Sequence, residues 1–126
     1  MTTRKILYSP GYGAGWTTWN RENRDVQMLM LTYAPIVAFL EAGNCFTYEE
    51  SETKWSEDEE TLESEASLHP LLRQLRAEAR AIDLTSRVYV GGAHQLRVAI
   101  VSGRVKIDEY DGSESFIVEG DFSEWL

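Results

Sequence analysis

The sequence has few of the residues from which catalytic and metal sites are usually built. Its 126 residues include one cysteine, Cys45, and two histidines, His69 and His94. A single cysteine forms no internal disulfide, which fits a reducing compartment, and without a basic neighbour Cys45 is expected to be a small buried residue. Two distant histidines disfavour a zinc site or a Ser-His-Asp triad. We therefore expect no metal, cofactor or catalytic residue, with His94 as the only candidate general base.

Long apolar runs and nucleotide-binding signatures are also absent. No apolar stretch approaches the roughly 20 residues that span a bilayer, and the first residues lack the apolar core of a signal peptide. No glycine-rich loop ends in Gly-Lys-Ser, and the run Gly11–Gly15 lacks the full dinucleotide-binding spacing. With 43% hydrophobic and 26% charged residues, the composition is that of one globular domain over 1–126. These absences favour a non-enzymatic, cytoplasmic protein without a membrane segment.

Negative charge is concentrated in the middle of the chain. The formal net charge is -9, and residues 49–65 contain nine acidic residues and one lysine. A local charge of -8 with few apolar anchors predicts a mobile arm or short helix at about 49–66, with Glu57–Glu60 exposed to solvent. A capping box at Ser56–Glu59 would start the helix. Duplex nucleic acid is disfavoured as a partner, because its binding requires a basic surface.

The first half of the chain carries helix signals after a short strand at Arg4–Ser9. We expect a helix capped by Thr17 or Asn20 that breaks near Ala34, because Pro35 fits only in a first helical turn. The apolar positions of this helix and of its continuation recur at helical spacing: Val26, Leu29, Met30 and Tyr33, then Ile36, Phe39 and Leu40.

A third helix is predicted after the acidic residues, capped by Ser67 and with Pro70 in its first turn. Its apolar stripe is Leu72, Leu75, Ala79 and Ile82, and Arg73, Arg76 and Arg80 form a second stripe. Two interpretations remain for the arginines. They pair with the acidic residues or with Glu78, or they form an anion-binding surface.

From Arg87 onward the apolar period changes to two, which predicts strands. Arg87–Val90 is the first, and two-residue turns at Ser102-Gly103 and Asp111-Gly112 link three more. These turn lengths place Val98 opposite Ile107, Ile107 opposite Phe116, and the like charges Glu109 and Glu114 opposite each other. The predicted fold is α+β: a helical first half packed on an antiparallel β-meander, which the N-terminal strand joins.

Glycine-rich loops follow two of the predicted strands, at Pro10–Trp16 and Gly91–Ala93. Alternate glycines let main-chain N–H groups converge on an anion, aromatic rings can stack on a base, and arginines can hold a phosphate. The alternative is that the glycines only turn the chain and the aromatic residues fill the core. The candidate ligand-binding residues are Tyr8, Gly11, Tyr12, Gly13, Gly15, Trp16, Gly91, Gly92, His94, Arg97 and Arg104, with Arg4 as a further source of charge.

Three motifs, at Lys5–Trp16, Val88–Ala93 and Glu109–Glu114, resemble segments of small accessory proteins encoded by tailed bacteriophages. The resemblance implies a protein made in the cytoplasm of an infected bacterium, and by analogy a counter-defence role. Two hypotheses follow. The protein sequesters a small nucleotide signal through its glycine-rich loops, as a homo-oligomer. Alternatively, it inhibits a host defence protein through its acidic residues, as a nucleic-acid mimic.

Overall fold

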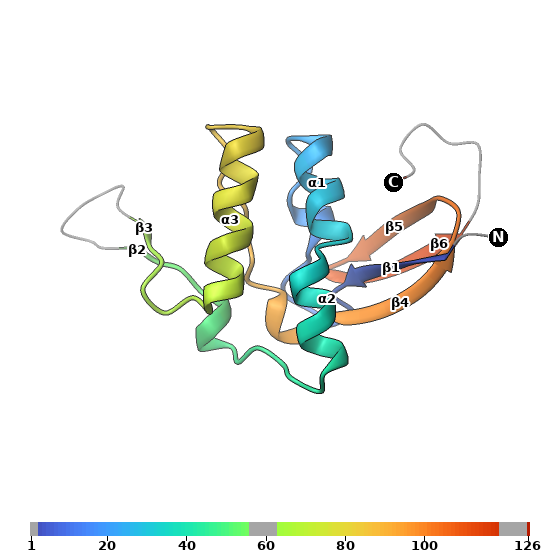
Figure 1. The fold of residues 1–126 in the computed structure, drawn as a ribbon, viewed down its shortest axis with the longest axis horizontal. Helices are drawn as coiled ribbons and strands as arrows, with labels where there is room; N and C mark the ends of the chain where they lie inside the picture. The colour runs from blue at the N-terminus through green and yellow to red at the C-terminus, as the bar shows by residue number, and fades with distance from the viewer. Residues whose placement is uncertain (1–2, 56–62, 119–125) are drawn as a thin grey trace.

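The computed structural model describes residues 3–55, 63–118 and 126 and has the α+β fold predicted from the sequence. Figure 1 shows α1, α2 and α3 gathered beside the strands β1, β4, β5 and β6. The elements are β1 (Thr3–Tyr8), η1 (Thr17–Trp19), α1 (Arg24–Leu31), α2 (Ala34–Glu41), η2 (Glu49–Ser51), β2 (Lys54–Trp55), β3 (Glu63–Ser64), α3 (Pro70–Ile82), η3 (Ala93–Gln95), β4 (Arg97–Ser102), β5 (Val105–Tyr110) and β6 (Ser113–Val118), where η marks a short 3₁₀ helix.

The first two helices are separated where the proline predicts it. α1 ends at Leu31, and α2 begins at Ala34 with Pro35 in its first turn, so the break near Ala34 is confirmed. The predicted cap is wrong: Asn23 precedes α1, and its side-chain oxygen accepts hydrogen bonds from the N–H groups of Asp25 and Val26 at 2.9 and 3.1 Å. Residues 17–19 form the separate 3₁₀ helix η1, which delays the start of α1.

α3 buries Leu72, Leu75 and Ala79 of the predicted apolar stripe, but Ile82 is 45% exposed, and the cap of the helix differs from the prediction. His69 Nδ1, not Ser67, accepts a hydrogen bond from the N–H of Leu71 at 3.1 Å. Within the second stripe, Arg76 is only 2% exposed. Arg76 and Arg80 lie 3.4 and 3.2 Å from the carboxylate of Glu65, which confirms the pairing of these arginines with the acidic segment, residues 49–66.

The predicted meander is wrong at its first turn. β4 pairs with β1 and not with β5, so Val98 faces Leu7 and not Ile107. A hairpin turn at Ser102-Gly103 would pair β4 with β5. In the structure, β4 pairs along its whole length with the N-terminal strand β1. Ile100 pairs with Lys5 and is 68% exposed.

The second turn has the predicted register. β5 and β6 form an antiparallel hairpin in which Val105 faces Val118 and Ile107 faces Phe116, as the Asp111-Gly112 turn predicts. Glu109 and Glu114 also face each other in this register. A main-chain hydrogen bond joins the hairpin to the residue that follows β1: the N–H of Glu114 donates to the carbonyl of Ser9 at 2.8 Å.

Two apolar clusters form the interior. The larger joins α1, α2 and α3 to the loop residue Trp16 and to the segment that precedes β4, and the smaller lies between α1 and the strands β1, β4 and β5. Val105, which belongs to β5, is fully buried in the smaller cluster. The predicted apolar face therefore packs into the interior on β5, where Val105 is buried, but not on β4, where Val101 is buried and Ile100 is exposed.

The acidic segment begins and ends in short elements. η2 opens it, and β2 pairs with β3 antiparallel beside α3 (Figure 1). Neither strand was predicted. The predicted capping box at Ser56–Glu59 and the exposure of Glu57–Glu60 lie outside the described residues.

Candidate functional site

The glycine-rich loop Pro10–Trp16 is organised around a buried carboxylate of its own chain. Glu114 is 2% exposed. Its Oε1 accepts a hydrogen bond from the N–H of Ser9 at 2.8 Å, and its Oε2 accepts from the N–H groups of Trp16 and Thr18 at 2.8 and 3.1 Å. The Thr18 hydroxyl donates to Oε2 at 2.6 Å. The main-chain donors in and around the loop thus converge on an anion, and that anion is Glu114.

The glycines of this region permit main chains to pack against one another. A Cβ on Gly92 would lie 2.5 Å from the carbonyl oxygen of Gly15, and a Cβ on Gly112 would lie 2.5 Å from the nitrogen of Ala14. The N–H of Gly13 donates to the carbonyl of Asp111 at 2.7 Å. The two predicted glycine-rich loops therefore lie side by side, with the β5–β6 turn packed on the first of them.

The predicted stacking rings occupy different environments. Trp16 is fully buried, and its indole N–H donates to the carbonyl of Met30 at 2.9 Å, so the prediction that Trp16 could cover a base is wrong. The alternative, that the aromatic residues fill the core, is confirmed for Trp16. Sequence pattern did not decide between the two, because an aromatic residue after glycines fits a surface loop and a core equally well. Tyr12 is 68% exposed. Tyr8 packs edge-on against Phe116 with ring centroids 5.2 Å apart.

The structure separates the predicted basic residues. Arg97 pairs with Tyr8 and lies at the loop end of the strands. Arg104 follows the turn at Gly103, and Arg4 donates to the carbonyls of Gly103 and Leu126 at 3.2 and 2.7 Å, both at the opposite end. Only Arg97 of the three therefore lies at the loop end of β1 and β4.

The remaining predicted residues belong to the supporting structure around the loops. Gly11 packs closely against Gln95, whose side-chain amide also reaches the carbonyl of Tyr12. Gly91 lies beside the ring of Tyr89. His94 lies in η3 next to Tyr48, with ring centroids 5.2 Å apart, and its buried Nδ1 has no hydrogen-bond partner among the described residues.

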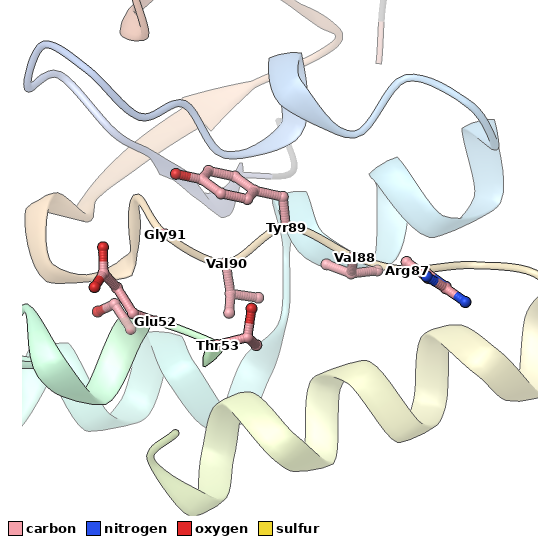
Figure 2. Close-up of a pocket in the computed structure, with 8 residues that line it drawn as sticks. Glu52, Thr53, Arg87, Val88, Tyr89, Val90 and Gly91 are labelled. Carbon is pink, nitrogen blue, oxygen red and sulfur yellow. The ribbon is translucent and has the colours of Figure 1, made fainter. Parts of the chain in front are cut away.

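A pocket of about 260 Å³ lies beside the second glycine-rich loop. Figure 2 shows Glu52 and Thr53 on one side of it and the segment Arg87–Gly91 on the other, with Glu52 at the Gly91 end. The segment was predicted to be a strand, but it belongs to none of the described sheets. The side chain of Asn20 holds it instead.

Asn20 satisfies one edge of this segment and leaves the other open. Its Oδ1 accepts from the N–H of Tyr89 at 2.7 Å, and its Nδ2 donates to the carbonyls of Tyr89 and Trp16 at 2.9 and 2.7 Å. In an extended chain, main-chain groups of successive residues point to opposite edges. Within the described part of the chain, the N–H groups of Val88 and Val90 and the carbonyl of Val88 have no hydrogen-bond partner. We call this the open edge.

The charge at the Gly91 end of the pocket is negative. The neighbouring Glu52 carboxylate, as a hydrogen-bond acceptor and through its charge, raises the pKa of Tyr48. Burial, and then the charge of Glu52, raises the pKa of Tyr89. Both phenols therefore stay neutral to a higher pH than an ordinary tyrosine. Tyr89 also contacts Trp19, with ring centroids 5.4 Å apart, so exposed aromatic surface continues from this end.

Sequence reasoning missed Asn20, Tyr48, Glu52 and Tyr89 as members of one site. A local sequence pattern was available for the turn next to Tyr48 and Glu52. Thr47 and Glu50 form a reciprocal capping box, in which each side chain accepts from the other's N–H, at 3.0 and 3.2 Å. The spacing Thr-x-x-Glu predicts such a turn. No local pattern indicates that this turn meets residues 87–91.

Cys45 is exposed, so the prediction of a buried cysteine is wrong. Nowhere in residues 3–55 and 63–118 do three or more potential metal ligands gather. Of the helices in these ranges, none has the length and apolar character needed to cross a membrane.

Comparisons of the chain with protein family descriptions, with curated proteins and with solved structures find no match.

Proposed function

We propose that the protein is a binding module that holds an extended basic segment of a partner protein in the pocket between Glu52 and the open edge. The observation that carries this proposal is the open edge itself, a row of unpaired main-chain groups beside a carboxylate and two tyrosines. A peptide that adds as a strand gains affinity from main-chain hydrogen bonds and specificity from neighbouring side chains. In the setting that the bacteriophage resemblance implies, the partner is a host defence protein.

The preference for a basic partner follows from the charges around the pocket. Glu52 attracts a lysine or arginine, and the exposed faces of Tyr48 and Tyr89 add cation–π attraction of about 0.5–1 kcal/mol. The acidic segment, with a local charge of -8, raises the rate of encounter with a basic surface. Arg87 lies at the other end of the pocket (Figure 2). It favours an acidic residue in the bound segment, about four positions from the lysine that Glu52 attracts.

A designed peptide tests this function. Lys-Val-Thr-Val-Asp is titrated into the protein, with binding measured by calorimetry and mapped by amide chemical shifts. We expect shifts at Val88 and Val90, and about tenfold weaker binding for Glu52→Gln or for a peptide with glutamine in place of lysine. Glu41→Gln is the control, because Glu41 pairs with Lys5 in a different part of the fold. Equal binding by the two peptides, or shifts that spare residues 87–91, would overturn the proposal.

The sequestering of a nucleotide signal by the glycine-rich loops is the second candidate. Two observations support it. Tyr12 is 68% exposed, and a Cβ added to Gly13 would have no neighbouring atom within 4 Å. The tip of the loop is therefore accessible. Against it, the donors from Ser9, Trp16 and Thr18 already bind Glu114. Calorimetry with cyclic dinucleotides and ADP-ribose tests it: binding that Gly13→Val abolishes would support this candidate.

A further inference from the structure

The strand β4 has one edge that no other described strand covers. Among the described residues it pairs only with β1. Figure 1 shows it at the margin of the group of strands. In an antiparallel pair, alternate residues of each strand direct their main-chain groups away from the partner strand. The outer side of β4, which we call the β4 edge, therefore presents N–H and C=O groups with which a further strand can pair.

The β4 edge lacks the features that keep most edge strands from pairing. Between Arg97 and Arg104 the chain has no charged residue and no proline. The strand is regular over its six residues, with an unbroken register against β1. Val98 and Ala99 are half-buried, and Ile100 is 68% exposed. An apolar edge without charge, proline or a bulge favours the addition of another strand.

The residue pattern of β4 suits pairing with a second copy of the same strand. Two copies related by a two-fold axis meet through the same surface, and the residue on the axis lies opposite itself. With the axis at Ala99, Val98 of each copy faces Ile100 of the other; with the axis at Ile100, the two Ile100 side chains face each other. Both registers cover Ile100, which lies beside a hollow of about 520 Å³ lined in part by Val37 and Ala38 of α2. Each copy thus covers the apolar surface that the other leaves exposed.

The position of Arg97 limits how far the two strands can slide. With the axis at Ala99, the Arg97 residues of the two copies lie about 13 Å apart along the strands, and with the axis at Ile100 about 20 Å apart. With the axis at Val98 they would be diagonal neighbours about 7–8 Å apart, and like charges that close destabilise a strand pair. Charge therefore favours an axis at the middle of β4, where the facing residues are apolar.

We propose that two copies of the protein pair antiparallel through the β4 edge, with the two-fold axis at Ala99 or Ile100. The pairing joins two two-stranded sheets into one sheet in the order β1-β4-β4-β1. The interface is independent of the proposed peptide pocket, because residues 97–102 do not line that pocket. A single six-residue strand is a small interface, and interfaces below about 1,200 Å² are typical of transient complexes. The dimer therefore forms and dissociates with protein concentration.

Sedimentation velocity from low micromolar to near-millimolar protein measures this dimer. Ile100→Glu places a charge inside the interface and should raise the dissociation constant at least tenfold, whereas the monomer should keep its melting temperature because Lys5 lies opposite. Ile117→Glu is the matched control: Ile117 is also exposed on a strand and faces a lysine, Lys106, but lies on β6. It should leave the dissociation constant unchanged. A protein that stays monomeric at every concentration, or equal losses in the two variants, would overturn the proposal.

Disulfide crosslinking locates the axis, in a Cys45→Ser background that removes the exposed native cysteine. Residues opposite themselves have Cα atoms about 4.5–5.5 Å apart, which a disulfide can bridge. Either Ala99→Cys or Ile100→Cys should therefore join two copies rapidly on oxidation. Ser102→Cys is the control, because its two copies would lie at least about 13 Å apart along the strands in both registers. Equal rates for the three variants, or no crosslinking by any of them, would contradict pairing through the β4 edge.

Discussion

The two glycine-rich loops lie against each other but differ in how their main-chain groups are satisfied. In Pro10–Trp16 and the residues around it, donors point inward and bind the buried carboxylate of Glu114. In the segment before Gly91, Asn20 pairs with one edge only, and the edge beside Glu52 is open. Unpaired main-chain groups can accept a partner, whereas groups bound to an internal anion hold the fold together. Glycine content alone does not distinguish the two situations.

The largest effect is expected from breaking the closed loop. Glu114→Gln places an amide N–H against at least one main-chain N–H, because every partner of the carboxylate is a donor. The loss of hydrogen bonds to a charged group, together with a buried N–H left without an acceptor, should lower the free energy of unfolding by about 3–5 kcal/mol. Urea denaturation measures it.

Glu109→Gln is the matched control for this change. Glu109 faces Glu114 across the hairpin but is exposed and accepts one hydrogen bond, from the N–H of Gly112 at 2.8 Å. It should change the free energy of unfolding by less than about 1 kcal/mol. Similar losses for the two variants would show that the buried hydrogen bonds of Glu114 contribute little.

This pair of glutamates also shows how far sequence reasoning reaches. The length of the Asp111-Gly112 turn fixed the β5–β6 register, and Pro35 fixed the helix break, because both constraints act over a few residues. The register placed two like charges opposite each other, which is unfavourable unless one carboxylate finds donors elsewhere. That conflict was the available signal that Glu114 turns inward. Its partners, about a hundred residues away in the chain, could not be identified from local pattern.

The failure at β4 has the same origin. Turn length predicts which residues face each other if two strands pair, but it does not say which strand takes the free edge. β1 occupies the edge of β4, so Val98 faces Leu7. The open edge likewise depends on a contact between residues 51–53 and 87–91 that no spacing encodes. Non-local contacts thus decided both the sheet order and the candidate site.

The second-largest effect should come from the contact between the closed loop and the β5–β6 turn. Gly112 has a φ of 83°, and a Cβ there would lie 2.5 Å from the nitrogen of Ala14. Gly112→Ala therefore combines an unfavourable backbone conformation with a clash against main chain, for a loss of about 3 kcal/mol. Urea denaturation would contradict this if alanine cost less than about 1 kcal/mol.

A smaller loss is expected where the two loops are joined. Asn20→Ala removes three hydrogen bonds, two to Tyr89 and one to Trp16, and should cost about 2 kcal/mol. Asn20→Asp keeps the acceptor for the N–H of Tyr89 but loses both donors. Its denaturation midpoint should lie between those of the wild type and the alanine variant. If the alanine variant matched the wild type, Asn20 would not hold the segment, and the open edge would lose its support.

The smallest effect should come from the tip of the closed loop, where strain can be separated from contact. Gly13 has a φ of 92°, similar to Gly112, but no atom lies within 4 Å of a Cβ built there. Gly13→Ala therefore introduces the backbone cost of a left-handed conformation without a clash, for a loss of about 1 kcal/mol. The difference between the two alanine variants, about 2 kcal/mol by urea denaturation, measures the packing of the turn on Ala14. Peptide binding at the open edge should be unchanged in Gly13→Ala, because Gly13 does not line the pocket between residues 51–53 and 87–91. Equal losses for the two variants would mean that backbone strain alone, and not close packing, explains the need for glycine at position 112.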